Sequence, residues 1–143
     1  MPSFRVGKPR LRLELAANVV LAAGFQLVPW DLVVFDDVGG YDGAGTYTFD
    51  RPGLWLFGSQ LRRDAVASSS NVFGRSMLNG VLDYSSPDIS TTAAQARHFG
   101  GLVQVEEGDT YRIEVRLHTT LAATLTAGTS WWWMTRIGPE RWT

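Results

Sequence analysis

The sequence predicts an all-β domain, built as a sandwich of antiparallel strands, from three observations. Short apolar or alternating runs recur along the chain, and clusters of Gly, Pro, Asp and Ser separate them, with 15 Gly and 6 Pro in 143 residues. This succession of strands and turn signals is typical of a sandwich or a barrel. No window shows the sustained 3.6-residue apolar period of a helix. We therefore expect roughly eight to ten short strands.

The composition limits the classes of function. Thirteen basic and fourteen acidic residues give a formal net charge of −1, so the chain has no overall field that would attract nucleic acid or an anionic membrane. The absence of cysteine excludes disulfides, thiolate zinc sites and thiol nucleophiles. The two histidines cannot form a multi-histidine metal site within one subunit. We expect no cofactor and no metal, and one domain over residues 10–143.

The domain is predicted to begin with a strand over residues 10–16. Leu11, Leu13 and Leu15 alternate there with charged residues, as in a strand with one buried face. The apolar run that follows resembles a signal peptide. Polar residues interrupt it, however, and it is far shorter than the ~20 residues of a membrane span. We expect neither membrane insertion nor export.

The next segments should form strands on both sides of a glycine-rich loop. Residues 25–35 predict one or two strands, interrupted at Pro29. Residues 36–45 must be a loop, because a glycine-rich run cannot hold a regular element. Residues 46–50 predict a short strand that ends at a Pro-Gly turn. Residues 54–57 are then apolar at every position, so this strand is expected to be covered on both faces.

The middle of the chain gives weaker signals. Residues 64–71 and 83–92 are rich in Ser, Asp and Asn and predict loops. Residues 72–82 carry most of the apolar side chains between these loops, and they predict a single strand.

The last third predicts three strands. Residues 98–105 form the first, and Glu106–Asp109 is a tight turn. Residues 111–117 alternate without a fault, so every second side chain from Tyr111 should face the core. The residues expected to face outward are Arg112, Glu114 and Arg116. Residues 131–134 form the closing strand.

Three successive tryptophans in the closing strand predict self-association. Trp131 and Trp133 must share one face of the strand, while Trp132 and Met134 share the other. One face can fill the core, and the other would expose a large apolar patch unless another surface covers it. Together with the two-sided strand 54–57, this predicts a homo-oligomer. The interface is expected to contain Trp55, Phe57, Trp131 and Trp133. The alternative is a single thick core covered by a loop.

Three aspartates in the glycine-rich loop are candidates for a ligand or calcium site. Asp36, Asp37 and Asp42 could supply oxygen ligands, although their spacing matches no EF-hand loop. The alternative is that these carboxylates only face water.

Groups that could support hydrolysis are present but dispersed. Ser68–Ser70, His98 and Asp109 could in principle form a triad, but no Gly-x-Ser-x-Gly turn presents a serine as a nucleophile. A histidine beside Phe99 is more often an ordinary strand residue. We expect that the chain is not an enzyme.

The order of motifs resembles the C1q-like domain of the C1q/TNF superfamily. The matching segments are Trp30–Phe35, Gly40-Tyr41-Asp42, Gly45–Phe49, Pro52–Phe57, Glu107-Gly108-Asp109 and Ser130–Met134. The resemblance extends from about residue 10 to about residue 137. The Asp36-Asp37 pair, where an Asn is common, and the triple Trp depart from the family pattern.

The resemblance implies a jelly-roll subunit of about ten strands. It also implies that three subunits pack as a compact homotrimer around a hydrophobic axis. Such domains are generally binding or structural modules, which agrees with the absence of a triad motif.

With no export signal expected, a virion component assembled in the host cytoplasm fits best. We expect a bacteriophage capsid decoration protein whose partners are capsid or other virion proteins. Residues 1–9 would then be a docking segment, in which Arg5 and Lys8, with Arg10 beside them, meet acidic capsid loops. The first alternative is a tail-fibre or spike domain that binds a host receptor or glycan, and the second is a small hydrolase.

Overall fold

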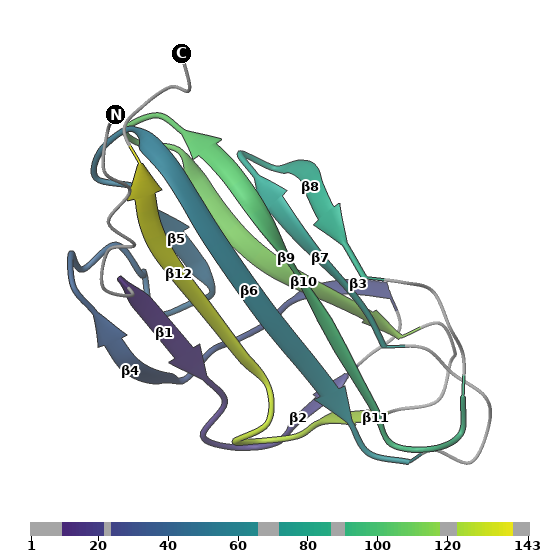
Figure 1. Cartoon of the computed structure of the whole chain (residues 1–143). Helices are drawn as coiled ribbons and strands as arrows, with labels where there is room; N and C mark the ends of the chain where they lie inside the picture. Colours follow the sequence, from purple (N-terminus) through teal and green to yellow (C-terminus); the bar gives the residue numbers. More distant parts are fainter. Residues whose placement is uncertain (1–9, 22–23, 66–71, 87–90, 118–122, 139–143) are drawn as a thin grey trace.

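Alternation of buried and exposed side chains produces two antiparallel sheets packed face to face (Figure 1). The computed structural model describes residues 10–21, 24–65, 72–86, 91–117 and 123–138. The strands are β1 (Leu11–Glu14), β2 (Val19–Leu21), β3 (Gly24–Leu27), β4 (Leu32–Asp36), β5 (Thr46–Thr48), β6 (Gly53–Arg63), β7 (Val72–Leu78), β8 (Val81–Ser85), β9 (Gln95–Val105), β10 (Thr110–Leu117), β11 (Ala123–Leu125) and β12 (Trp131–Gly138).

The first sheet is built around the long strand β6. Its order is β2-β11-β6-β12-β1-β4, and β9 also pairs with β6. The second sheet has the order β5-β10-β7-β8. Strand β3 lies beside β10, where the Val28 N–H donates to the Ile113 carbonyl at 3.1 Å. In Figure 1 the first sheet lies in front, with β12, β6 and β9 crossing its centre.

The core lies between the sheets and is dominated by aromatic rings. The Phe49 and Trp55 ring centroids are 5.0 Å apart, and those of Phe57 and Tyr111 are 5.1 Å apart, both edge to face. Trp132 is also fully buried. Aromatic pairs in this geometry contribute beyond the area that they bury.

The clearest sequence patterns are confirmed. Tyr111, Ile113 and Val115 are fully buried. Trp132 points into the core, whereas Trp131 and Trp133 are half-buried on the opposite face. Strands β3 and β4 are separate, as the break at Pro29 predicted.

The single strand predicted over residues 72–82 is wrong. The segment forms the β7–β8 hairpin, whose two turn residues, Asn79 and Gly80, have φ angles of 51° and 78°. Positive φ at both positions is the type I′ geometry that Asn-Gly favours, so the dipeptide was a local signal for this turn. Strand β8 therefore also occupies the start of the loop expected over residues 83–92.

Strand number also differs from the expectation of about ten, because the described residues form twelve strands. The unexpected ones include the short strands β2 and β11, which pair with each other. Each has only 3 residues, too few for an alternating pattern to be recognised in the sequence.

Candidate functional site

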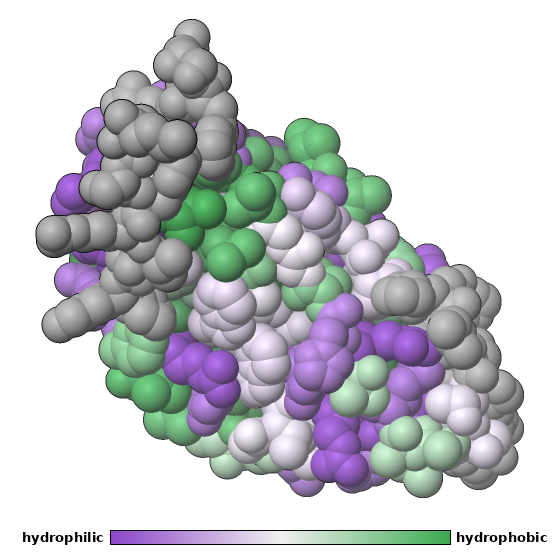
Figure 2. Space-filling view, viewed as in Figure 1, coloured by the Kyte–Doolittle hydropathy of each residue, from purple (hydrophilic) through white to green (hydrophobic). Residues whose placement is uncertain are grey.

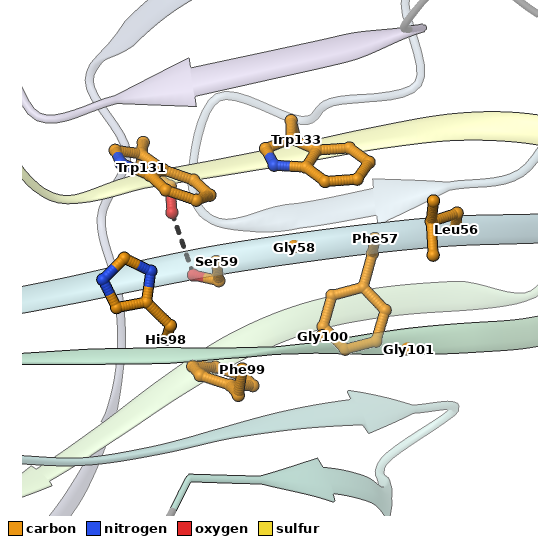
Figure 3. Close-up of a pocket in the computed structure, with 10 residues that line it drawn as sticks. All are labelled: Leu56, Phe57, Gly58, Ser59, His98, Phe99, Gly100, Gly101, Trp131 and Trp133. Carbon is orange, nitrogen blue, oxygen red and sulfur yellow. Dashed lines mark hydrogen bonds between the residues drawn. The ribbon is translucent and has the colours of Figure 1, made fainter.

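The outer face of the first sheet has an aromatic hollow of about 490 Å³ (Figure 3). Strands β6, β9 and β12 supply its walls and floor. The residues that line it are Leu56, Phe57, Gly58, Ser59, His98, Phe99, Gly100, Gly101, Trp131 and Trp133. In Figure 3 the two tryptophans lie on one side of the hollow and His98 and the glycines of β9 on the other.

Two glycines make the floor of this hollow. Gly58 and Gly100 are direct cross-strand partners on β6 and β9. A Cβ on Gly58 would come within 2.8 Å of the Trp133 ring, and a Cβ on Gly100 would reach 2.4 Å from the Phe57 carbonyl oxygen. The absence of a side chain at Gly58 therefore lets the Trp133 indole lie against the sheet backbone, and Gly100 allows β9 to approach the backbone of β6 closely.

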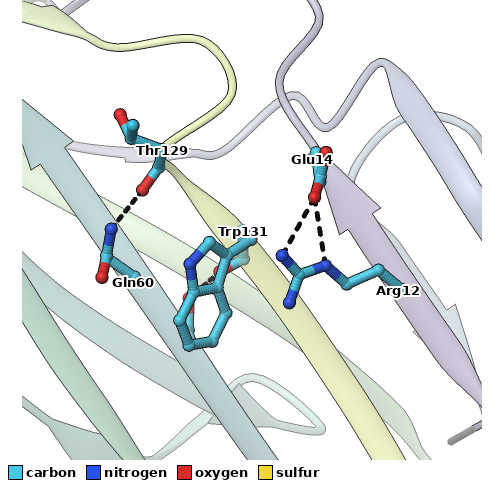
Figure 4. A network of polar contacts seen from close by, with 6 residues as sticks. Arg12, Glu14, Gln60, Thr129 and Trp131 are labelled. Atoms are coloured by element: carbon cyan, nitrogen blue, oxygen red, sulfur yellow. Dashed lines mark hydrogen bonds and ion pairs between the residues drawn. The ribbon is translucent and has the colours of Figure 1, made fainter.

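Trp131 has polar neighbours on both sides. The Arg12 guanidinium lies 4.9 Å from the centroid of its ring, within cation–π distance. Glu14 holds that guanidinium through an ion pair of 2.9 Å (Figure 4). The His98 ring stands edge-on to Trp131 at 6.1 Å. Two side chains of β6 hold the start of β12, because Gln60 donates to the Thr129 carbonyl and Ser59 to the Trp131 carbonyl.

The upper part of the same face is apolar. Leu56 and Leu102 are cross-strand partners, and Leu102 is 45% exposed. In Figure 2 hydrophobic residues gather over the upper part of β6, while hydrophilic ones lie toward β1 and the lower end of β9. A second apolar surface lies at the β7–β8 hairpin, where Val81 is 68% and Leu82 56% exposed.

The structure separates the four residues predicted for a subunit interface. Trp131 and Trp133 lie on the open face of the first sheet, available to another subunit. Trp55 and Phe57 are each only 1% exposed, and their rings pack against Phe49 and Tyr111 inside the sandwich. Their assignment to the interface is wrong, because a side chain enclosed by its own subunit cannot contact a second one.

The acidic loop has a structural role in this chain. Asp36 accepts hydrogen bonds from the N–H groups of Gly39, Gly40 and Tyr41. The Tyr41 hydroxyl in turn donates to the Trp30 carbonyl at 2.6 Å, and burial, with Asp42 nearby, raises its pKa to about 12. Tyr41, which belongs to the Gly40-Tyr41-Asp42 motif of the family resemblance, therefore holds the loop in place.

Asp42 caps the following turn. One of its carboxylate oxygens accepts bonds from the N–H groups of Ala44, Gly45 and Thr46 at 2.7–3.0 Å. Burial raises the pKa of Asp42, but these backbone bonds outweigh that effect and leave it below its ordinary value. Among the described residues no three His, Asp or Glu side chains converge as metal ligands. The calcium interpretation of Asp36, Asp37 and Asp42 therefore has no support in the geometry.

The remaining candidate residues lie apart from one another. Asp109, in the turn before β10, accepts hydrogen bonds from the Glu106 N–H and from the Asn79 side chain. His98 lies elsewhere, against Trp131. The candidate serines Ser68–Ser70 fall outside the described residues. The described part of the chain therefore brings no histidine and aspartate together as a triad would require.

Of the three residues predicted for docking, only Arg10 lies within the described part of the chain. Arg5 and Lys8 lie outside the described residues. Arg10 is half-buried, and its N–H donates to the Met134 carbonyl at 2.8 Å. Within the described ranges, no helix is long and apolar enough to cross a membrane.

Comparison with known proteins identifies the fold. No protein-family model and no curated protein sequence matches the chain. Among solved structures, the globular domain of zebrafish complement 1qA protein is similar, with a TM-score of 0.70 and 16% identity over 92% of this chain and 99% of that one. Murine APRIL at pH 5.0 gives a TM-score of 0.65 and 13% identity over 90% and 98% of the two chains. The chain thus has a C1q/TNF-like jelly-roll fold, as the motif resemblance predicted.

Proposed function

We propose that the chain is a non-enzymatic subunit that assembles as a homotrimer and serves as a capsid decoration protein of a bacteriophage. The trimer would form through the outer face of the first sheet, and the assembled protein would reside in the virion. The observation that carries this proposal is the aromatic hollow, where Trp131 and Trp133 remain half-exposed beside Leu56.

The position of the apolar surfaces supports a ring. The face around Trp133 and the β7–β8 hairpin with Val81 and Leu82 are different surfaces of one subunit. A contact that joins two different surfaces repeats head to tail and generates a closed ring when the rotation permits. Three copies joined in this way would cover both apolar surfaces in every subunit.

The decoration role needs a second, polar surface that remains free when the trimer forms. Loops and the outer face of the second sheet lie away from the hollow (Figure 1). A decoration protein needs only self-association and attachment to the shell, and neither requires a catalytic site. The expected attachment through Arg5, Lys8 and Arg10 is part of this proposal.

Two measurements test the proposal separately. Light scattering at micromolar concentration should give the mass of three subunits, and a stable soluble monomer would contradict the trimer. Purified capsids should bind the protein at a fixed number of copies per head. A trimer that binds no capsid would overturn the decoration role, whereas the proposal of a trimer would stand.

The polar surroundings of Trp131 favour a second candidate function, recognition of a host-surface glycan. Indole faces next to hydrogen-bonding groups such as Arg12, Gln60 and His98 suit the stacking of a sugar ring. Binding to host cells or glycans, lost in Trp131→Ala and accompanied by no affinity for capsids, would establish this function in place of decoration.

A further inference from the structure

The outer face of the second sheet carries three arginines around one glutamate. Alternate residues of β10 are fully buried, so Arg112, Glu114 and Arg116 point away from the core. Arg75 of β7 lies directly opposite Glu114 as its cross-strand partner. These four side chains carry two more positive than negative charges.

Each carboxylate oxygen of Glu114 accepts a hydrogen bond from one of the arginines. The Arg75 Nε donates to Glu114 Oε1 at 2.7 Å, and the Arg112 Nε donates to Oε2 at 2.9 Å. The side chain of Glu114 is only 11% exposed, whereas those of Arg75 and Arg112 are 25% and 38% exposed. The carboxylate thus lies beneath two guanidinium groups whose side chains are partly exposed.

Arg116 packs beside two phenyl rings, Phe25 and Phe73, which contact each other edge to face with centroids 5.9 Å apart. Its guanidinium carbon is 4.7 Å from the centroid of Phe25 and 5.3 Å from that of Phe73. Its Nε is shielded from solvent and has no hydrogen-bond partner. The guanidinium of Arg75 also stacks on Phe25, at 3.4 Å. Stacked guanidinium groups are held in a fixed orientation and are weakly hydrated, so an incoming anion displaces little water from them.

We propose that this arginine–phenylalanine cluster, which comprises Phe25, Phe73, Arg75, Arg112, Glu114 and Arg116, docks an acidic segment of a partner protein. Two carboxylates of the partner would pair with Arg112 and Arg116, whose Cα atoms lie about 13 Å apart along β10, a spacing that side chains of one extended acidic segment can reach. Arginine and aromatic residues are both enriched at protein interfaces. The fork of a guanidinium matches a carboxylate in two parallel hydrogen bonds.

The cluster lies on the opposite side of the sandwich from Trp131 and Trp133. It is also separate from the apolar residues that the proposed trimer would bury, which are those around Trp133 and, on the β7–β8 hairpin, Val81 and Leu82. The inference goes beyond the proposed function and does not depend on the trimer, because each subunit carries a complete cluster.

A labelled hexaglutamate peptide tests the site, with binding to the intact chain followed by fluorescence anisotropy. We expect saturable binding whose affinity falls as the salt concentration rises. The affinity should also fall at least about tenfold in Arg116→Gln and in Arg112→Gln. Arg51→Gln is the matched control, because Arg51 is exposed in the turn before β6 and pairs only with its neighbour Asp50. This control should bind as the unchanged chain does.

The variant Arg116→Lys distinguishes recognition of a carboxylate by the guanidinium fork from general electrostatic attraction. This variant keeps the charge and loses the fork, so it should bind several-fold more weakly than the unchanged chain. Equal binding by Arg116→Lys, equal losses in Arg51→Gln, or binding of dextran sulfate without hexaglutamate would each overturn the proposal. Thermal melting confirms that each variant is folded. If Arg116→Gln unfolds, the more exposed Arg112 carries the test.

Discussion

Trp133 lies against Gly58, so close that a Cβ on the glycine would stand 2.8 Å from the indole ring. The substitution Gly58→Ala should therefore push the indole away from the sheet and change the shape of the aromatic hollow. The side-chain and backbone shifts that relieve such a contact lower the free energy of unfolding by about 1–3 kcal/mol. We expect weaker subunit association, measured by light scattering against concentration, and a shift in tryptophan fluorescence.

Gly138→Ala is the control for that experiment. A Cβ at Gly138 would meet only the Leu54 Cβ, at an ordinary contact distance of 3.9 Å. This variant should associate as the unchanged chain does. If Gly58→Ala also kept the original mass and fluorescence, the close packing of Trp133 on the glycine floor would have no role in assembly.

Substitutions at Trp55 and Trp133 should have different outcomes, because the two side chains lie on opposite faces of the first sheet. Trp55→Ala removes a ring packed against Phe49 and should lower the free energy of unfolding by about 3–5 kcal/mol. Trp133→Asp places a charge on the half-exposed face and should give a folded subunit that no longer associates. Thermal melting and light scattering together separate these results. A folded trimer from Trp133→Asp would exclude this face as the interface.

Removal of the Asp42 carboxylate should destabilise the protein in a pH-dependent way. The pKa of Asp42 is lowered in the folded chain from its ordinary value of 3.8. The bonds from three N–H groups therefore contribute fully above pH 3.8, and their contribution is lost as the pH falls through the lower, folded value. At neutral pH, Asp42→Ala should lower the free energy of unfolding by about 1–2 kcal/mol.

Denaturant unfolding at several pH values measures this effect. The difference between Asp42→Ala and the unchanged chain should shrink below pH 3.8. Asp37→Ala is the control, because Asp37 is exposed and caps no turn. A difference that stayed constant from neutral pH into the acid range would mean that the carboxylate charge does not hold the turn.

Sequence patterns identified which side chains share a face but not always which face is the core. At Trp131, Trp132 and Trp133 the alternation placed one ring inside and two outside, as observed. In the run 54–57 every position is apolar, so the pattern could not distinguish the core-facing Trp55 from the outward Leu56. Pairing of β6 between β9 and β12 settles that choice, and the partners lie more than 40 residues away in the chain.

Other features had no local signal at all. The arginine–phenylalanine cluster brings Phe25 of β3 onto Arg75 of β7 and Arg116 of β10. Nothing in the sequence near Phe25 indicates these partners, because the contact depends on β3 lying beside β10. The outward direction of Arg112, Glu114 and Arg116 was predicted, yet the pairing of Glu114 with Arg75 follows only from the register between β7 and β10.

Arg63 should be necessary for stability although it is charged and lies at the end of β6. Its side chain is fully buried, and it donates to the carbonyl groups of Asp64, Thr91 and Ala93. Arg63→Met would keep much of the volume but remove the donor from these carbonyl groups, at a cost of about 1–3 kcal/mol for each one that water does not reach. Arg62→Met, at a half-buried neighbouring position, should change the melting temperature little. Equal melting temperatures for the two variants would show that water replaces the guanidinium and that the segment before β9 is held without it.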